Sequence, residues 1–159
     1  AKTAQLINKA IEEMRSITRV LHPFQLEGIG ISKALERLIL ELNENYKNLY
    51  IFGDIQNLES KLNADQEVNI YRIVQECLSN IIKHAKATSA KVRLTEKKGS
   101  IYITIMDNGI GFNFSLKYNN RKSLGLKTIK ERVKFLKGTV RVDSIKNEGT
   151  IYNISFPKK

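Results

Sequence analysis

Cysteine is almost missing from this sequence. The chain has one cysteine, Cys77, among 159 residues, which excludes an internal disulfide framework. Cys77 lies within an apolar helical stretch, so a buried thiol is expected there, and such sparse cysteine favours a reducing, cytoplasmic setting. Apolar runs long enough to cross a bilayer are also missing, and no signal peptide is apparent. We therefore expect one cytoplasmic globular domain with at most a small appendage.

Acidic residues are scarce beside the basic ones. Sixteen Asp and Glu stand against 27 Lys and Arg, so the formal net charge is +11. Such a balance suits a polyanionic partner, whether nucleic acid, an anionic membrane surface or a nucleotide. The lysines are scattered along the chain, and aromatic residues are not interleaved with them as a base-stacking platform requires. A solvated basic surface therefore accounts for the charge more simply, and no nucleic-acid partner is predicted.

Apolar periodicity predicts four helices and five strands. The helices are expected at residues 1–21, 32–42, 64–87 and 124–137, and the strands at 49–52, 90–96, 100–106, 139–144 and 150–156. Ser32 is predicted to cap the start of the second helix, and Gly138 to end the last one. Residues 43–48 and 113–123 predict loops. The order of elements predicts a two-layer α/β sandwich, with a mixed sheet and helices on one face, preceded by one amphipathic helix.

The stretch from Asp107 to Phe112 places a carboxylate and two glycines directly after a predicted strand. Gly109 and Gly111 permit left-handed backbone and the close approach of a ligand. The Asp107 carboxylate can accept a hydrogen bond from an amine. A plain strand-ending turn explains this stretch equally well when it is considered alone.

A polar stripe follows one face of the helix predicted at residues 64–87. Glu76, Asn80 and Lys83 are spaced i, i+4 and i+7, with His84 beside them. An acid, an amide and a cation in line can hold a hydrated metal ion and a phosphate. A solvated helix face with ordinary ion pairs is the alternative.

A third candidate segment runs from Ser123 to Leu126 at the start of the last predicted helix. Free backbone N–H groups and the helix dipole favour phosphate at such a position. The basic loop at residues 113–123 joins this segment to the Asp107 turn, as a lid would. The three segments together predict one anion-binding site.

Several stretches of the sequence resemble a known family in the same order along the chain. They are Glu76 to Ala85, Asp107 to Phe112, Gly125-Leu126 with Glu131 to Val133, and Glu148-Gly149-Thr150. The chain resembles the ATP-binding domain of bacterial sensor histidine kinases, DNA gyrase, the Hsp90 chaperone and the mismatch-repair ATPase, which has a Bergerat-type fold. It is most similar to histidine kinases that signal to helix-turn-helix response regulators.

The N-terminal residues resemble another part of the same kinases. The stretch between Glu13 and Glu27 is similar to the second helix of their dimerisation domain. The resemblance therefore implies that residues 1–24 belong to a truncated dimerisation and phosphotransfer domain, and that residues 25–159 form the ATP-binding catalytic domain.

The resemblance implies a role for each residue at the adenine end of the site. Asp107 would accept a hydrogen bond from the adenine amine. Gly109 and Gly111 would let the adenine and the lid backbone approach, and Thr150 would help to close the pocket.

At the phosphate end, Asn80 would bind Mg²⁺, an ion that is usually shared with substrate phosphates. Lys83 would reach the phosphates, and His84 would line the same side. Glu76 would position groups on the metal side rather than act as the proton acceptor. The backbone of four consecutive residues would contact the phosphate chain: Ser123, Leu124, Gly125 and Leu126.

The sequence departs from the family pattern in two ways. Ser123 stands where a glycine is usual, so weaker or altered phosphate contacts are expected. The helix that carries the phosphorylated histidine is missing, since the two histidines, His22 and His84, occupy other positions. The chain is therefore expected to bind ATP and Mg²⁺ without phosphorylating itself. Its expected partners are the missing acceptor helix, a second protomer and a cognate response regulator, with membrane contact only through upstream segments.

Two other functions remain open from the sequence. A free-standing nucleotide-dependent regulator, such as an anti-sigma factor that is also a protein-serine kinase, would share the fold. A basic nucleic-acid-binding protein without enzyme activity would explain the charge.

Overall fold

The computed structural model describes residues 26, 28–112 and 124–158. Within this part of the chain, five strands form one sheet in the order β1-β2-β3-β5-β4. The β1 and β2 strands are parallel, and the other neighbours are antiparallel. The bounds of the strands are β1 Tyr50–Ile55, β2 Ser89–Lys97, β3 Ser100–Asp107, β4 Thr139–Ile145 and β5 Gly149–Pro157.

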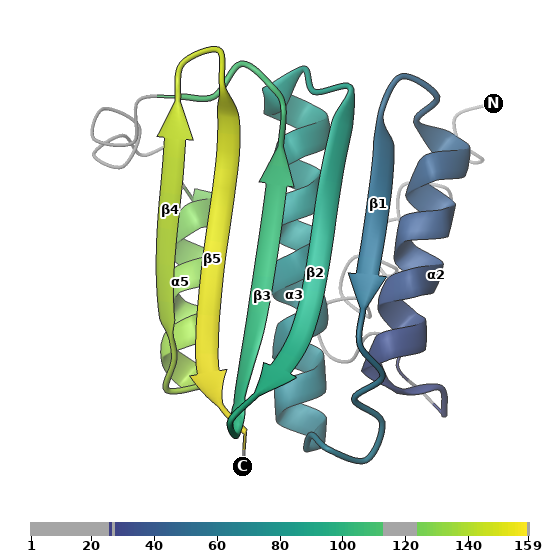
Figure 1. The fold of residues 1–159 in the computed structure, drawn as a ribbon, viewed down its shortest axis with the longest axis vertical. Coiled ribbons are helices and arrows are strands. Elements are labelled where there is room, and N and C mark those ends of the chain that lie inside the picture. The colour runs from purple at the N-terminus through teal and green to yellow at the C-terminus, as the bar shows by residue number, and fades with distance from the viewer. Residues whose placement is uncertain (1–25, 27, 113–123, 159) are drawn as a thin grey trace, which may run out of the picture.

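The helices lie together on one face of this sheet (Figure 1). Their bounds are α2 Gly30–Asn45, α3 Ala64–Asn80, the π-helical turn η2 Ile81–Ala85 and α5 Leu124–Phe135. The predicted two-layer α/β sandwich with a mixed sheet is confirmed. The helix predicted at residues 1–21 and the loop predicted at 113–123 lie outside the described residues.

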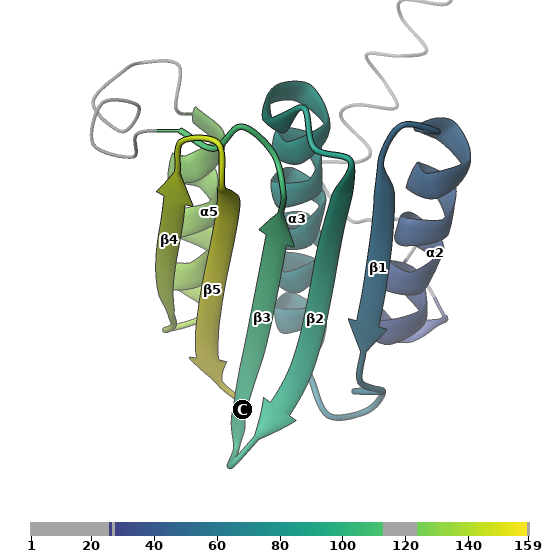
Figure 2. The same ribbon diagram turned by 45° about the horizontal axis from the view of Figure 1, so that its top comes forward.

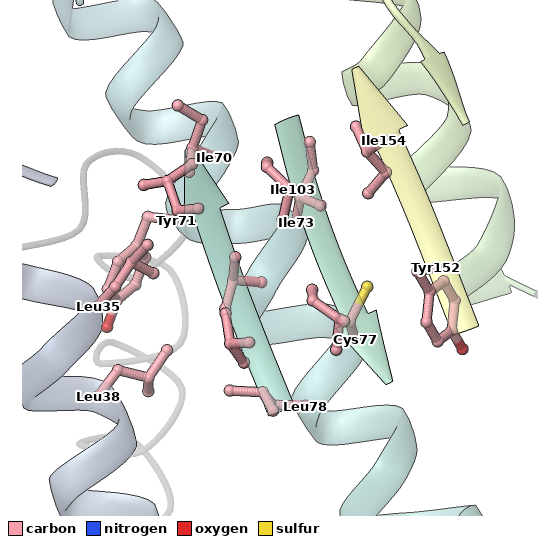
Figure 3. Close-up of a cluster of buried hydrophobic side chains, with 14 of the residues drawn as sticks. Leu35, Leu38, Ile70, Tyr71, Ile73, Cys77, Leu78, Ile103, Tyr152 and Ile154 are labelled. Carbon is pink, nitrogen blue, oxygen red and sulfur yellow. The ribbon is translucent and has the colours of Figure 1, made fainter. Parts of the chain in front are cut away.

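The core fills the space between the helices and the inner face of the sheet. Along β3, Ile101, Ile103 and Ile105 are fully buried and alternate with exposed or half-buried residues. This period of two presents one apolar face to the helices. The facing side of α3 carries Ile70 and Cys77, both fully buried, and Figure 3 shows Cys77 against β3 close to Tyr152 of β5. The buried thiol predicted at Cys77 is thus confirmed.

A capping box fixes where α3 begins. The Asn63 side chain accepts a hydrogen bond from the Gln66 N–H at 2.9 Å, and the Gln66 side chain accepts one from the Asn63 N–H at 3.3 Å. These bonds satisfy two donors that the helix itself leaves free. The start of α3 is therefore determined by the local sequence.

The N-cap predicted at Ser32 is wrong. The α2 helix begins at Gly30, and Ser32 lies inside it, buried. Its hydroxyl donates to the Gln56 carbonyl at 3.1 Å and accepts from the Leu58 N–H at 2.9 Å. Serine is used here to bind the segment after β1, which local capping rules cannot anticipate.

The polar loop predicted at residues 43–48 is wrong at its start, because α2 continues to Asn45. The Asn43 side chain accepts from the Ile51 N–H at 2.8 Å and donates to the Ile51 carbonyl at 2.9 Å. The helix thereby satisfies both backbone groups of one residue in the edge strand β1, in the way a neighbouring strand would.

The C-cap role predicted for Gly138 is also wrong. Lys137 has the left-handed backbone after α5, with φ of 57°. A Cβ at position 138 would lie 2.8 Å from the Phe156 Cβ. Gly138 is needed for close packing of the α5–β4 connection on β5, and its N–H still closes the helix by donating to the Val133 carbonyl at 2.9 Å.

The described helices include none that is long and apolar enough to cross a membrane.

Candidate functional site

A pocket lies at the end of the sheet where β3 finishes and β5 begins. Figure 2 brings this end forward, with the end of the α3–η2 helix and the start of α5 beside it. The lining residues come from all of these elements: Asn80, Ile81, His84, Ala85, Asp107, Gly111, Phe112, Gly125, Leu126, Thr150 and Tyr152. Segments that are far apart in the sequence therefore form one site.

Asp107 is the last residue of β3, and only 8% of its surface is exposed. Its carboxylate accepts a hydrogen bond from the Gly109 N–H at 2.8 Å. Burial raises the pKa of Asp107, and the backbone N–H groups of Gly109 and Thr150 lower it in part. The result is a mostly dehydrated hydrogen-bond acceptor on the pocket wall.

The loop after Asp107 is bonded to the elements on either side of it. Asn108 accepts from the N–H groups of Thr88 and Ser89 at 3.0 and 2.9 Å. Ile110 donates to the Ala85 carbonyl at 2.7 Å, and its own carbonyl accepts from the β4–β5 turn. The backbone of this loop is therefore held in place without any ligand.

Gly109 and Gly111 are needed because the backbone has no room for side chains. A Cβ on Gly109 would lie 2.7 Å from the Ala85 Cβ, although its own backbone conformation is ordinary. Gly111 has φ of +57°, and a Cβ there would lie 2.9 Å from the Gly149 carbonyl oxygen. Gly109 thus packs the loop against η2, whereas Gly111 lines the pocket directly.

Ser144 on β4 joins three parts of the pocket wall. Its hydroxyl accepts from the Phe112 N–H at 2.9 Å and lies 2.9 Å from the Thr150 hydroxyl. It also donates to the Gly149 carbonyl at 3.2 Å. Thr150 is buried and lines the pocket. Ser144 was missed by the sequence analysis, because a serine in an alternating strand gives no signal of its cross-strand contacts.

The opposite wall belongs to α3. The Asn80 side chain lines the pocket, and its Nδ2 is buried without a hydrogen-bond partner within the described part of the chain. Buried polar groups normally have a partner, so the Asn80 Nδ2 is a donor that a ligand in the pocket could satisfy. Gly125 at the start of α5 lies so close that a Cβ would meet the Glu76 carboxylate and lie 3.3 Å from the Asn80 Nδ2. Glu76 is therefore beside the pocket but behind Gly125.

The helix turns into a π-helix directly after Asn80, which changes the predicted stripe. His84 still lines the pocket, whereas Lys83 lines a separate hollow with Leu42 and Tyr71, between α2 and the α3–η2 helix. A π-turn has more residues per turn than an α-helix, so residues beyond it are rotated from their expected face. The phosphate contact predicted for Lys83 stays a prediction.

The start of α5 closes the pocket on its third side. Leu124 is the first residue of α5, and Gly125 and Leu126 line the pocket. Ser123 lies outside the described residues. Phe112 and Tyr152 also line the pocket and were not singled out from the sequence. Tyr152 alternates with other core positions of β5, so its pattern predicted only burial.

A metal site made by the protein alone is not evident. The described residues contain no group of three or more His, Cys, Asp and Glu side chains that could hold a metal ion. The unpartnered Asn80 Nδ2 is a hydrogen-bond donor that suits a phosphate oxygen, whereas a hard cation would have to be bound by the Oδ1 of the same side chain, with phosphate oxygens and water as its other ligands.

The family of the chain follows from comparison with known proteins. The model of the family described as histidine kinase-, DNA gyrase B-, and HSP90-like ATPase matches residues 65–159, which contain the whole pocket. The chain belongs to this family. The match identifies residues 65–159 as an ATPase-type domain of the kind found in histidine kinases.

Similar proteins include two sensor histidine kinases of Bacillus subtilis (strain 168). ComP is 32% identical over 147 residues, which are 90% of this chain and 19% of ComP. LiaS is 32% identical over 152 residues, which are 96% of this chain and 41% of LiaS. The chain therefore spans less than half the length of these relatives.

The fold is also similar to solved structures. The histidine kinase domain of the blue-light activated histidine kinase from Erythrobacter litoralis EL346 superimposes with a TM-score of 0.70 at 20% identity. The match covers 80% of this chain and 65% of that chain. This similarity shows the shared fold.

Proposed function

We propose that the pocket binds Mg²⁺-ATP and presents its γ-phosphoryl group to a histidine on a helix outside this chain. The observation that carries this proposal is the buried Asp107 carboxylate opposite the unpartnered Asn80 amide in one pocket. One group accepts from the adenine amine, and the other faces the phosphates. The distance between them along the pocket sets the orientation of the nucleotide.

At the adenine end, Asp107 accepts a hydrogen bond from the exocyclic amine, and Gly111 and Thr150 form the adjoining wall. The support is the burial of the carboxylate and the absence of room for side chains at Gly109 and Gly111. A hydrogen bond to a charged group of this kind contributes about 1.5–3 kcal/mol.

At the phosphate end, the backbone N–H groups of Gly125 and Leu126 bind phosphate oxygens at the start of α5. Asn80 supplies an oxygen to Mg²⁺, and His84 lies on the same side. Ser123, Leu124 and Lys83 are proposed to add contacts, and Glu76 positions Gly125 and Asn80. The metal ion and these donors neutralise charge on the transferred group, which is the main requirement of phosphoryl transfer.

The proposed acceptor and partners lie outside this chain. Residues 1–24 are proposed to be the second helix of a dimerisation domain, which joins an acceptor helix and a second protomer in the intact kinase. A response regulator then receives the phosphoryl group.

The test is titration with a fluorescent ATP analogue in the presence of Mg²⁺. Asp107→Asn should weaken binding at least about 10-fold, as loss of a charged hydrogen bond predicts. Asp143→Asn is the matched control. Asp143 lies on β4 outside the residues that line the pocket, and its carboxylate pairs with the Arg141 guanidinium at 2.9 Å. Equal affinities of the wild type and Asp107→Asn would contradict the proposal.

A further inference from the structure

Tyr152 is a polar residue on the pocket wall whose hydroxyl has no assigned role. Only 3% of its surface is exposed, and it lines the pocket together with Asp107 and Thr150. No hydrogen bond of this hydroxyl is made within the described part of the chain, although Ser144 and Thr150 nearby are fully bonded to one another and to the backbone. The hydroxyl can therefore donate a hydrogen bond to a molecule in the pocket.

The geometry of the sheet brings this hydroxyl toward the level of Asp107. Thr150 pairs with Asp107 and Tyr152 with Ile105, so Tyr152 starts one pleat further along β5, about 7 Å from the level of Asp107. Figure 3 shows the ring turned so that its oxygen points toward the end where β3 finishes. A tyrosine side chain is long enough for its hydroxyl to cover most of the distance along β5 between the two residues.

The protonation state suits a donor. Burial, with smaller contributions from Cys77, Asp107 and Glu76, raises the pKa of Tyr152 well above its ordinary value. The phenol therefore keeps its proton at neutral pH. An acceptor and a donor, Asp107 and Tyr152, face the same end of the pocket.

Adenine carries the complementary pair on one edge, where the exocyclic amine donates and the adjacent ring nitrogen N1 accepts. We propose that the Tyr152 hydroxyl donates a hydrogen bond to N1 of adenine while Asp107 accepts from the amine, so that Tyr152 is a base-specificity residue. This inference rests on the proposed function. It adds a second polar group to base recognition and explains why a polar side chain occupies a core position of β5.

The energetic argument is that a bound base excludes water from the hydroxyl. A phenol closed off without a partner is penalised, so the bound state requires an acceptor beside it. Guanine has a donor at N1 and an acceptor at position 6, which reverses the pattern. The Tyr152 hydroxyl can accept from that N1–H, but Asp107 then faces an oxygen, so guanine is bound more weakly.

The experiment compares ATP with 1-deaza-ATP, in which N1 is replaced by a C–H group, by competition against a fluorescent ATP analogue. Tyr152→Phe should weaken ATP binding about 5- to 20-fold and change 1-deaza-ATP binding less than about 2-fold. The wild type should itself prefer ATP to 1-deaza-ATP by a similar factor. Tyr102→Phe, on the exposed face of β3, is the control and should bind both ligands as the wild type does.

Thermal unfolding of each variant shows whether the fold is kept. An equal loss for ATP and 1-deaza-ATP in Tyr152→Phe, or no loss for either, would overturn the N1 contact. If the wild type failed to bind ATP, or Asp107→Asn bound it unchanged, the proposed function itself would fail. If Asp107→Asn weakens ATP binding and Tyr152→Phe does not, only the hydrogen bond from Tyr152 to N1 is rejected.

Discussion

Asp107 is held where ionisation is unfavourable, and the fold offsets that cost only in part. The backbone N–H groups of Gly109 and Thr150 lower the pKa of the carboxyl group, yet burial is the larger effect and the pKa stays raised. A strand end that served only as a turn would not need a buried charge, because an asparagine makes the same bond to the Gly109 N–H. The charge is therefore better explained by a ligand that donates to it.

The raised pKa of Asp107 predicts how stability depends on pH. A carboxyl group with a raised folded-state pKa favours folding at pH values below its ordinary pKa of 3.8, and this contribution is lost as the pH rises through the folded-state pKa. Asp107→Asn removes this dependence. The free energy of unfolding of the variant should therefore rise relative to that of the wild type as the pH rises above 3.8. Urea denaturation at several pH values measures the difference, and a difference that falls with pH would contradict the assignment.

Gly109→Ala tests the closeness of the loop to η2. The added Cβ would lie 2.7 Å from the Ala85 Cβ and 2.8 Å from the Ala85 carbonyl carbon, so one of the two segments must move. We expect a loss of about 1–3 kcal/mol in the free energy of unfolding, together with weaker nucleotide binding.

The matched control for that substitution is Gly99→Ala in the β2–β3 turn. Gly99 has φ of +76°, and an added Cβ there would have nothing within 4 Å. An alanine at this position is therefore strained by its backbone conformation but makes no steric clash. It should cost about 1 kcal/mol and leave nucleotide affinity unchanged. Equal effects of both substitutions on binding would show that the contact with Ala85 does not shape the pocket.

Elements were predictable from the sequence where their signals are local. The predicted strands at residues 90–96 and 100–106 leave a short connection that contains Gly99, and in the structure Lys98 and Gly99 form the β2–β3 turn with positive φ, of 50° and 76°. The π-turn after Asn80 was not predictable, because its sequence continues the helical pattern of α3 without a break. That turn rotates Lys83 away from the face that carries Asn80. The i, i+4, i+7 spacing would place both residues on one face of a regular α-helix, but the helix that forms is not regular there.

The edge strand β1 depends on a side-chain contact from α2 that the sequence did not reveal. Asn43→Ala would remove the side chain that bonds both backbone groups of Ile51. We expect a loss of about 1–3 kcal/mol in the free energy of unfolding, because a half-buried N–H and C=O lose their partners. Asn45→Ala is the control. Its side chain makes one exposed bond to the Glu41 carbonyl, and its removal should change stability by about 0.5 kcal/mol or less. A similar small loss for both variants would show that the edge does not need Asn43.

At the scale of the whole molecule, one face of the sheet builds the core and one end builds the site. The outer face carries exposed side chains, among them Arg93 paired with Asp54 at 2.7 Å and Lys91 over the Phe52 ring at 5.1 Å. The convergence of the predicted segments on one pocket was expected from their order, whereas the contributions of Tyr152 and Ser144 required the register of β4 and β5.

The last prediction separates specific nucleotide binding from attraction to a basic surface. A ligand that binds only the folded state at about 100 times its Kd stabilises that state by about 2.7 kcal/mol, which for a chain of this length corresponds to a rise of about 5–10 °C in Tm. Mg²⁺-ATP should give this rise, and inorganic tripolyphosphate at the same concentration should give much less, because it has no base to bond with Asp107. Asp107→Asn should remove the difference between the two ligands while it keeps the +11 charge of the chain nearly unchanged. Equal stabilisation of the wild type by both ligands, lost together at high salt, would instead identify the polyphosphate charge as the sole determinant of binding.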